Sequence, residues 1–235
     1  DTVRRRYEGT TLGRQELYGE LLNEVPGALL TDEKISAVRC KGIEVPELAR
    51  LVIGVDPAVS SSEEADHTGI CVMGLGGPPE GWRPARPTLA GAPHLYVLED
   101  ASIRATAEVW ARRVLDRADY WDADGISAEV NQGGGLVEST LRLLAGSEGR
   151  RFPPYKPVTA SRAKTARAEP VAALVEQGRL HFVGRFPELE DELVTWVPGS
   201  TPKSPDRMDA WVWAACDLVP ELAIKSGTPI SILAG

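Results

Sequence analysis

Three acidic positions in this 235-residue chain stand where the neighbouring residues would hold a carboxylate rigidly. Asp56 follows the apolar, β-branched run Leu51–Val55, which is typical of a buried strand, and Pro57 ends that strand. Glu129 lies in the apolar stretch 126–130, where a carboxylate is rarely found unless it is paired or binds a metal ion. Taken singly, Asp56 is explained equally well as a turn residue, and Glu129 as an edge-strand residue that faces water.

The third position is a pair of aspartates near the C-terminus. Asp206 and Asp209 are three residues apart, so both face one side of the first turn of a helix expected over Asp206–Leu218. One of them is explained as an acid favoured by the helix dipole, and this alternative fits Asp206 better. The bulky run Trp211–Trp213 indicates that the helix is largely buried, which would carry Asp209 into the interior.

Clustered carboxylates with no histidine or cysteine partner form a set of ligands that favours Mg²⁺ or Mn²⁺. The three histidines and three cysteines show none of the spacings of a zinc site. Two such ions about 3.5–4 Å apart would activate a water molecule and stabilise the leaving oxygen of a phosphodiester. A fourth acid, Asp66, returns from the loop before the second strand, and either supports the second ion or simply belongs to the turn.

A basic segment at residues 150–167 contrasts with the overall net charge of −8. It contains no acid, and its positive residues are Arg150, Arg151, Lys156, Arg162, Lys164 and Arg167. Lys and Arg neutralise phosphate groups whatever the base sequence, so the last five are the candidate DNA contacts, with a solvated helix face as the alternative. The net negative charge argues little against DNA binding, because bound cations would neutralise a carboxylate site.

The elements that must position these residues follow from the hydrophobic pattern. Apolar runs predict strands over 51–55, 69–75 and 94–98, close enough in sequence to form an antiparallel meander. The later elements are expected as a helix over 106–118, a strand over 125–130, a helix over 136–144, a strand over 155–158, a helix over 163–176, a strand over 180–183, and helices over 186–196 and 206–218. No sheet is expected in residues 1–48. This order predicts an α/β fold whose central mixed sheet, antiparallel in its first three strands and parallel afterwards, is flanked by helices.

Four ordered motifs resemble a known family. They are Gly54–Ala58, Ala128–Gly134, Ala160–Pro170 and Ser204–Ala210, and they look like the large terminase subunit of tailed bacteriophages. The C-terminal domain of that family is an RNase H-like endonuclease, which makes the double-strand cuts that begin and end the packaging of concatemeric DNA. The resemblance implies an RNase H-like nuclease domain over residues 49–220 that works with two Mg²⁺ or Mn²⁺ ions. It also implies that Asp56, Glu129 and Asp209 are the catalytic metal ligands, with Asp206, Asp66 and Lys164 as supporting residues.

The resemblance also implies partners and a setting. These are double-stranded DNA, an ATPase motor domain, the small terminase subunit and the portal of the packaging machine, in the host cytoplasm. No Gly-x-x-x-x-Gly-Lys-Ser/Thr phosphate-binding loop occurs in the sequence, so no ATPase motor is expected in this chain. Residues 1–48 are expected to be a linker or the trailing segment of that motor, and residues 221–235 a C-terminal tail.

Other classes of function stay open on the sequence alone. An RNase H-like nuclease of the junction-resolvase type would share the chemistry and differ in substrate. A sugar-kinase or actin-like ATP-binding domain also begins with a strand that ends in Asp, but its further phosphate- and adenosine-binding motifs are not found. A non-catalytic DNA-binding module would not require the intact acids. No apolar run approaches the roughly 18–20 residues of a membrane span, so no membrane association is expected.

Overall fold

The computed structural model describes residues 25–41, 44–57, 67–84, 86–130, 135–160, 163–199 and 205–224, without the side chains of Ala223 and Ile224. Two candidate site residues, Asp66 and Arg162, lie outside these ranges. No helix among the described residues has both the length and the apolar character needed to cross a bilayer.

An eight-stranded mixed sheet forms the centre of the domain. Its path runs through β1 (Arg39–Cys40), β8 (Leu180–Val183), β4 (His94–Asp100), β3 (His67–Gly76), β2 (Leu48–Asp56), β6 (Gly125–Glu129) and β7 (Tyr155–Val158), and β5 (Ile103–Arg104) pairs with β3. Strands β2, β3 and β4 form an antiparallel meander, whereas β6 is parallel to β2, β7 to β6 and β8 to β4. The expected sheet, antiparallel first and parallel afterwards, is confirmed.

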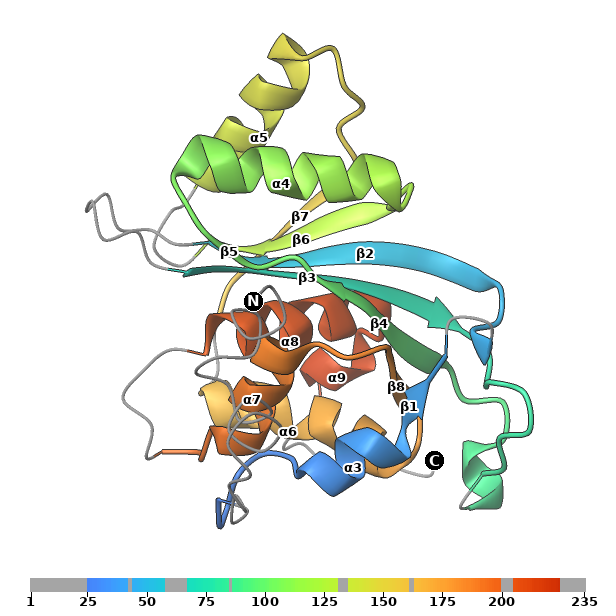
Figure 1. Ribbon diagram of the computed structural model, residues 1–235. Coiled ribbons are helices and arrows are strands. Elements are labelled where there is room, and N and C mark those ends of the chain that lie inside the picture. The colour runs from blue at the N-terminus through green and yellow to red at the C-terminus, as the bar shows by residue number, and fades with distance from the viewer. Residues whose placement is uncertain are drawn as a thin grey trace, which may run out of the picture.

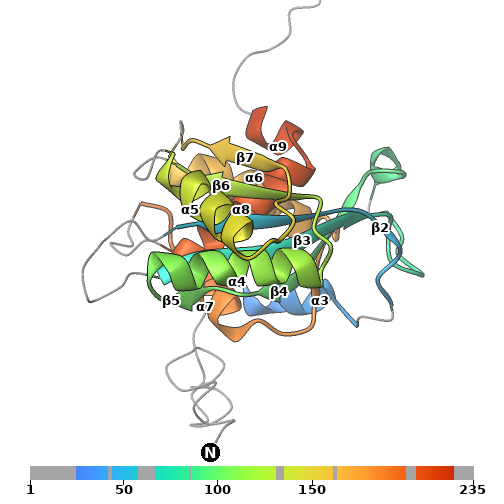
Figure 2. The same ribbon diagram turned by 90° about the horizontal axis from the view of Figure 1, so that it is seen from above.

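Helices cover both faces of this sheet (Figure 1). One face carries α4 (Ala107–Tyr120) and α5 (Leu136–Ser147), and the other carries α3 (Asp32–Ala37), α6 (Lys164–Glu176), α7 (Pro187–Thr195), α8 (Asp206–Leu218) and α9 (Glu221–Ile224). Figure 2 shows α4 and α5 lying over the strands from the first side. Alternate residues of β2 therefore enter two cores: Ile53 and Val55 pack with α4 and α5, and Val52 packs with α8.

The segment before β2 contributes more to the domain than its sequence suggests. Arg39 and Cys40 form an edge strand parallel to β8, while Leu30 and Ile35 are buried in the core on the α8 side. The expectation of no sheet in residues 1–48 is wrong here. A two-residue strand has no periodicity to detect, and β1 exists because β8, near the other end of the chain, supplies its partner. The short elements β5, η2 (Pro87–Leu89) and α9 were likewise not expected, and α9 lies in the segment 221–235 that was predicted to be a tail.

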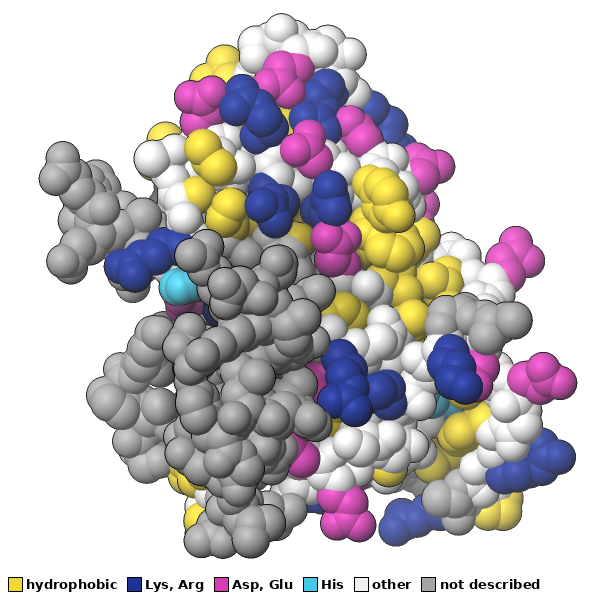
Figure 3. Space-filling view, viewed as in Figure 1, with side chains coloured by type: hydrophobic (Ala, Val, Ile, Leu, Met, Phe, Trp, Pro, Cys, Tyr) yellow, Lys and Arg dark blue, Asp and Glu magenta, His cyan; other side chains and the backbone are white. Residues whose placement is uncertain are grey.

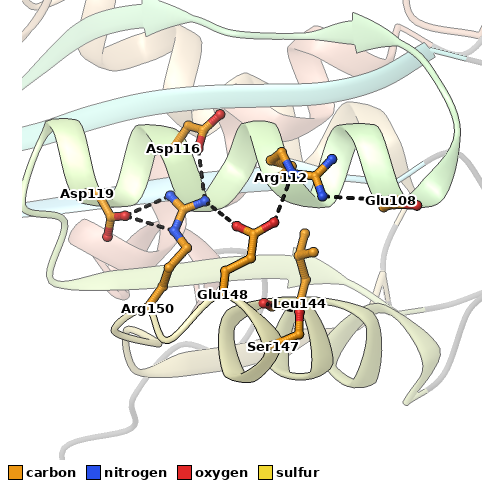
Figure 4. Close-up of polar contacts among 8 residues, drawn as sticks. All are labelled: Glu108, Arg112, Asp116, Asp119, Leu144, Ser147, Glu148 and Arg150. Carbon is orange, nitrogen blue, oxygen red and sulfur yellow. Dashed lines mark hydrogen bonds and ion pairs between the residues drawn. The ribbon is translucent and has the colours of Figure 1, made fainter.

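An ion-pair network fastens α4 to the turn that follows α5 (Figure 4). The Arg150 guanidinium lies 2.9 Å from Asp116, 2.7 Å from Asp119 and 3.1 Å from Glu148, and Arg112 lies 2.9 Å from the other oxygen of Glu148. Acidic and basic side chains are interspersed on the upper part of the face seen in Figure 3. The first arginine of the basic segment thus joins two helices and is only 15% exposed.

Helix α8 lies against the sheet with backbone touching backbone. A methyl group added to Gly54 on β2 would stand 2.7 Å from the Ala214 nitrogen and closer still to the Ala210 carbonyl oxygen. One added to Gly69 on β3 would overlap the carbonyl of Asp206. Only glycine leaves room for this approach, so the two glycines fix the height of α8 above the sheet.

This packing predicts a difference between two glycine-to-alanine substitutions. Gly54→Ala should lower the free energy of unfolding by at least about 1–3 kcal/mol, the usual cost of overpacking, because backbone atoms of α8 must move away. Gly146→Ala in α5, where nothing lies within 4 Å of the added carbon, should be neutral or gain about 0.5–1 kcal/mol of helix propensity. Urea denaturation measures both, and equal free energies for the two variants would contradict the close contact of α8.

Candidate metal centre

Asp56 and Glu129 stand at the ends of two neighbouring parallel strands. Asp56 is the last residue of β2 and Glu129 the last of β6, and the register places Val55 beside Ala128 one step earlier. The two carboxylates therefore leave the sheet at the same edge. Both are on the face that α8 covers, because side chains alternate along a strand and Gly54 touches α8.

Asp209 reaches the same region from the first turns of α8. Its side chain is almost completely buried and is bracketed by two cations from α6. The ammonium group of Lys164 forms an ion pair with Oδ2, and Nη2 of Arg167 donates to Oδ1 at 3.2 Å. A buried carboxylate is tolerated only when its charge is compensated, and here α6 supplies the compensation.

Asp56 is influenced both by its burial and by the charges of the other acids. Burial and the negative charges of Asp209, Glu129 and Asp206 raise the pKa of Asp56 from 3.8 to about 8, and Lys164 opposes this only in part. Burial is the largest cause, because a desolvated carboxyl favours its neutral form. The structure thus brings together four of the five acids that the sequence singled out; the fifth, Asp66, lies outside the described residues.

A set of contacts at the N-terminus of α8 holds the turn that carries Asp206 and Asp209. Oε2 of Glu192 accepts the backbone N–H of Met208 at 3.0 Å, while Arg207 lies 3.1 Å from Asp100 and 3.5 Å from Glu192. Burial, more than any other cause, raises the pKa of Glu192 to about 7. No sequence pattern links Glu192 or Asp100 to this helix, because Glu192 comes from the preceding helix α7 and Asp100 from the distant strand β4.

Trp213 is another residue of the site that the sequence reading missed. It lies four residues after Asp209 and therefore one helical turn further along the same face of α8. Its indole Nε1 donates to Oε2 of Glu129 at 2.9 Å. The i, i+4 spacing from Asp209 is the sequence signal that places Trp213 beside the site, whereas its apolar neighbours indicate only a core position.

The acids do not form a finished ligand set in this arrangement. Among the residues that the structure describes, no three His, Cys, Asp or Glu side chains converge closely enough to hold a metal ion. Both oxygens of Asp209 face cations, and one oxygen of Glu129 faces the indole of Trp213. The donor chemistry nevertheless fits a hard divalent cation, since carboxylate oxygens are the ligands that such ions prefer.

The other described residues of the basic segment are also paired with acids from elsewhere in the chain. Arg151 lies 3.2 Å from Asp122, and Lys156 lies 2.6 Å from Asp217. Asp217, near the end of α8, also accepts from Arg50 at 3.0 Å, so it ties the helix to β2 and β7. Lys156 and Arg151 remain about half exposed, at 51% and 52%, and their contact with DNA stays a prediction.

A mixed sheet of this order, with helices on both faces and acids at the ends of β2 and β6 and on α8, defines an RNase H-like domain. Three solved structures are similar to it. The nuclease domain of the large terminase subunit gp2 of bacterial virus Sf6 is 11% identical, with 79% of this chain and 96% of that chain covered and a TM-score of 0.52. The large terminase nuclease from thermophilic phage G20c with bound zinc is 14% identical, with 78% and 97% covered and a TM-score of 0.48. RuvC from Thermus thermophilus is 15% identical, with 70% and 90% covered and a TM-score of 0.38.

The family model of the terminase RNaseH-like domain matches residues 53–218, and the chain belongs to this family. The likeness to the Sf6 domain shows the fold, and a comparison with curated proteins finds no match. The expected fold class and the resemblance to large terminase subunits are confirmed, and membership of the family supports a nuclease. Membership of this family excludes the sugar-kinase or actin-like alternative.

The raised pKa of Asp56 predicts a pH dependence of stability without metal. Between pH 3.8 and about 8 the folded state keeps a proton that the unfolded state has lost, so stability falls as the pH rises through this window. Asp56→Asn removes this effect. As the pH rises through this window, the free energy of unfolding of the variant should increase relative to that of the wild type by up to about 1.4 kcal/mol per pH unit.

Urea denaturation at pH 5 and pH 8 with a chelator measures this gain. Asp122→Asn is the matched control, since its side chain is 94% exposed and should change neither value. If Asp56→Asn follows the wild type at both pH values, burial and the neighbouring acids do not raise the pKa of Asp56 as described.

Proposed function

We propose that this domain is a metal-dependent endonuclease that cuts double-stranded, concatemeric DNA during packaging of a viral genome. One observation carries the proposal: Asp56 and Glu129 end two neighbouring parallel strands on the face that α8 covers, and α8 buries Asp209 there. Membership of the terminase RNaseH-like family supports the same reading independently. In such a site, negative charge gathered on rigid elements serves to bind cations.

Asp56, Glu129 and Asp209 are the proposed metal ligands and catalytic residues, and Asp206 and Asp66 are proposed to complete the set. An all-carboxylate set matches Mg²⁺ or Mn²⁺, and the proposal includes two ions. When bound, such ions lower the pKa of a water molecule and stabilise the leaving oxygen of the phosphodiester.

The chain's own residues prepare this site. The strand ends of β2 and β6 hold Asp56 and Glu129 side by side, and α8 brings Asp209 opposite them. Lys164 and Arg167 both pair with Asp209, so a cation that binds Oδ2 displaces Lys164, while Arg167 keeps its hydrogen bond to Oδ1. Once released, Lys164, whose side chain is 28% exposed, is free to meet a backbone phosphate of the substrate.

The DNA contacts are proposed for the basic residues Arg151, Lys156, Arg162, Lys164 and Arg167. For the packaging role we further propose an ATPase motor domain, the small terminase subunit and the portal as partners, in the host cytoplasm. The motor itself is proposed to lie outside this chain, because the sequence has no phosphate-binding loop of the Gly-x-x-x-x-Gly-Lys-Ser/Thr type.

The nuclease activity is tested on supercoiled plasmid. Wild type should nick and linearise the plasmid with Mg²⁺ or Mn²⁺ and not with a chelator. Asp56→Asn should lose at least about 10²-fold in rate, the scale of removing one electrostatic stabiliser of the transition state. Glu108→Gln, an exposed acid on α4 that pairs with Arg112 away from the proposed ligands and DNA contacts, should cut like wild type. An intact plasmid with wild type under every metal, or equal cutting by Asp56→Asn, would sink the proposed function.

The DNA contacts predict a dependence on salt. Removing both exposed charges with Arg151→Gln and Lys156→Gln should weaken duplex binding and reduce the slope of log K against log salt by about 0.9 per lost phosphate contact. Arg50 still pairs with Asp217 in this variant, which protects the fold. Lys34→Gln on α3 is the control, because Lys34 pairs with Glu176 away from β7. Fluorescence anisotropy of a labelled duplex measures the slopes, and equal slopes in all proteins would exclude these two contacts.

A further inference from the structure

The indole of Trp213 connects the two halves of the candidate site. Its edge donates the Nε1 proton to Oε2 of Glu129 at 2.9 Å. Its face carries the guanidinium of Arg167, whose central carbon lies 4.7 Å from the ring centroid. The same guanidinium donates to Oδ1 of Asp209 at 3.2 Å. One buried side chain therefore touches the acid at the end of β6 and the cation that holds the acid on α8.

The hydrogen bond from Trp213 restricts the orientation of the Glu129 side chain. A glutamate side chain has three rotatable bonds, and ordering it costs on the order of 1.5–2 kcal/mol of conformational entropy. An indole N–H is only a donor, so its partner here must be an acceptor oxygen. The Trp213 ring is itself fixed, since it is 5% exposed and packed between α8 and the Arg167 guanidinium.

The neighbouring tryptophan on α8 gives a contrast. Trp211 is fully buried, and in the described part of the chain its Nε1 has no hydrogen-bond partner. Its ring belongs to the hydrophobic core on the α8 side of the sheet. Burial of large rings along α8 does not explain why the Trp213 nitrogen meets a carboxylate of the site.

We propose that Trp213 is a positioning residue, which orients Glu129 directly and Asp209 through Arg167 for a hard divalent cation. The inference rests on the proposed function, because it concerns the same carboxylates. Hydrogen-bond partners of metal ligands typically change metal affinity by 10–100-fold when they are removed. Trp213 is such a hydrogen-bond partner of Glu129.

The test compares Trp213→Phe with Trp211→Phe. Both substitutions remove the same atoms from buried positions on one helix, but only Trp213→Phe removes a donor to Glu129. Mn²⁺ affinity, measured by electron paramagnetic resonance with no DNA present, should fall about 10–100-fold for Trp213→Phe. Trp211→Phe should bind Mn²⁺ like the wild type while losing thermal stability. Equal Mn²⁺ affinities of the two variants would overturn the role of Trp213.

A measurement on the wild type keeps the proposal testable if Trp213→Phe does not fold. In a ¹H–¹⁵N spectrum, the indole N–H signal of Trp213 should shift as Mg²⁺ is added, and that of Trp211 should stay in place. A Trp213 signal that does not respond at saturating Mg²⁺ overturns the inference while the proposed function stands. Wild type that binds neither Mn²⁺ nor Mg²⁺ and leaves plasmid intact overturns the proposed function and this inference together.

Discussion

The contact of α8 with two glycines of the sheet is the constraint on which the candidate site depends. Gly54 and Gly69 let the helix backbone approach β2 and β3 more closely than any side chain would permit. Gly69 pairs with Asp56 across the two strands, so the closest approach falls beside the first acid. The carboxylates on α8 are therefore brought to the strand ends by backbone packing, which is stiffer than any contact between long side chains.

Charge compensation is the second condition of the fold. Gathering acids in a buried place destabilises the folded state unless cations balance them, and Lys164 and Arg167 supply part of that balance for Asp209. Burial, and after it the remaining repulsion from Asp209, Glu129 and Asp206, raises the pKa of Asp56 to about 8. Such residual repulsion is common where a site is adapted to a ligand at the expense of stability. Elsewhere the acids are near the surface, as around Arg150, which faces three partly exposed carboxylates whose remaining charge is solvated by water.

The sequence predicted the parts of the fold that hydrophobic patterns encode. The meander, the alternating helices and strands after it, and the strand-end position of Asp56 all depend on local runs of apolar residues. The edge strand Arg39–Cys40 depends on β8, and no local signal exists for it. The basic segment looked uniformly positive because its acids, such as Asp119 and Asp217, come from distant elements. The hydrogen bond of Trp213 to Glu129 likewise follows from register and packing and not from composition.

The position of α8 late in the chain decides when the candidate site is completed during synthesis. The acids come from β2, from β6 and from a helix that ends only at Leu218, close to the C-terminal end of the described chain. A ribosome-bound chain that has exposed β2 through β8 still lacks Asp206 and Asp209, and the sheet face that α8 will cover is still open. On the proposed function, an unfinished polypeptide lacks two of the proposed metal ligands, and the complete set of acids arises only after α8 has docked.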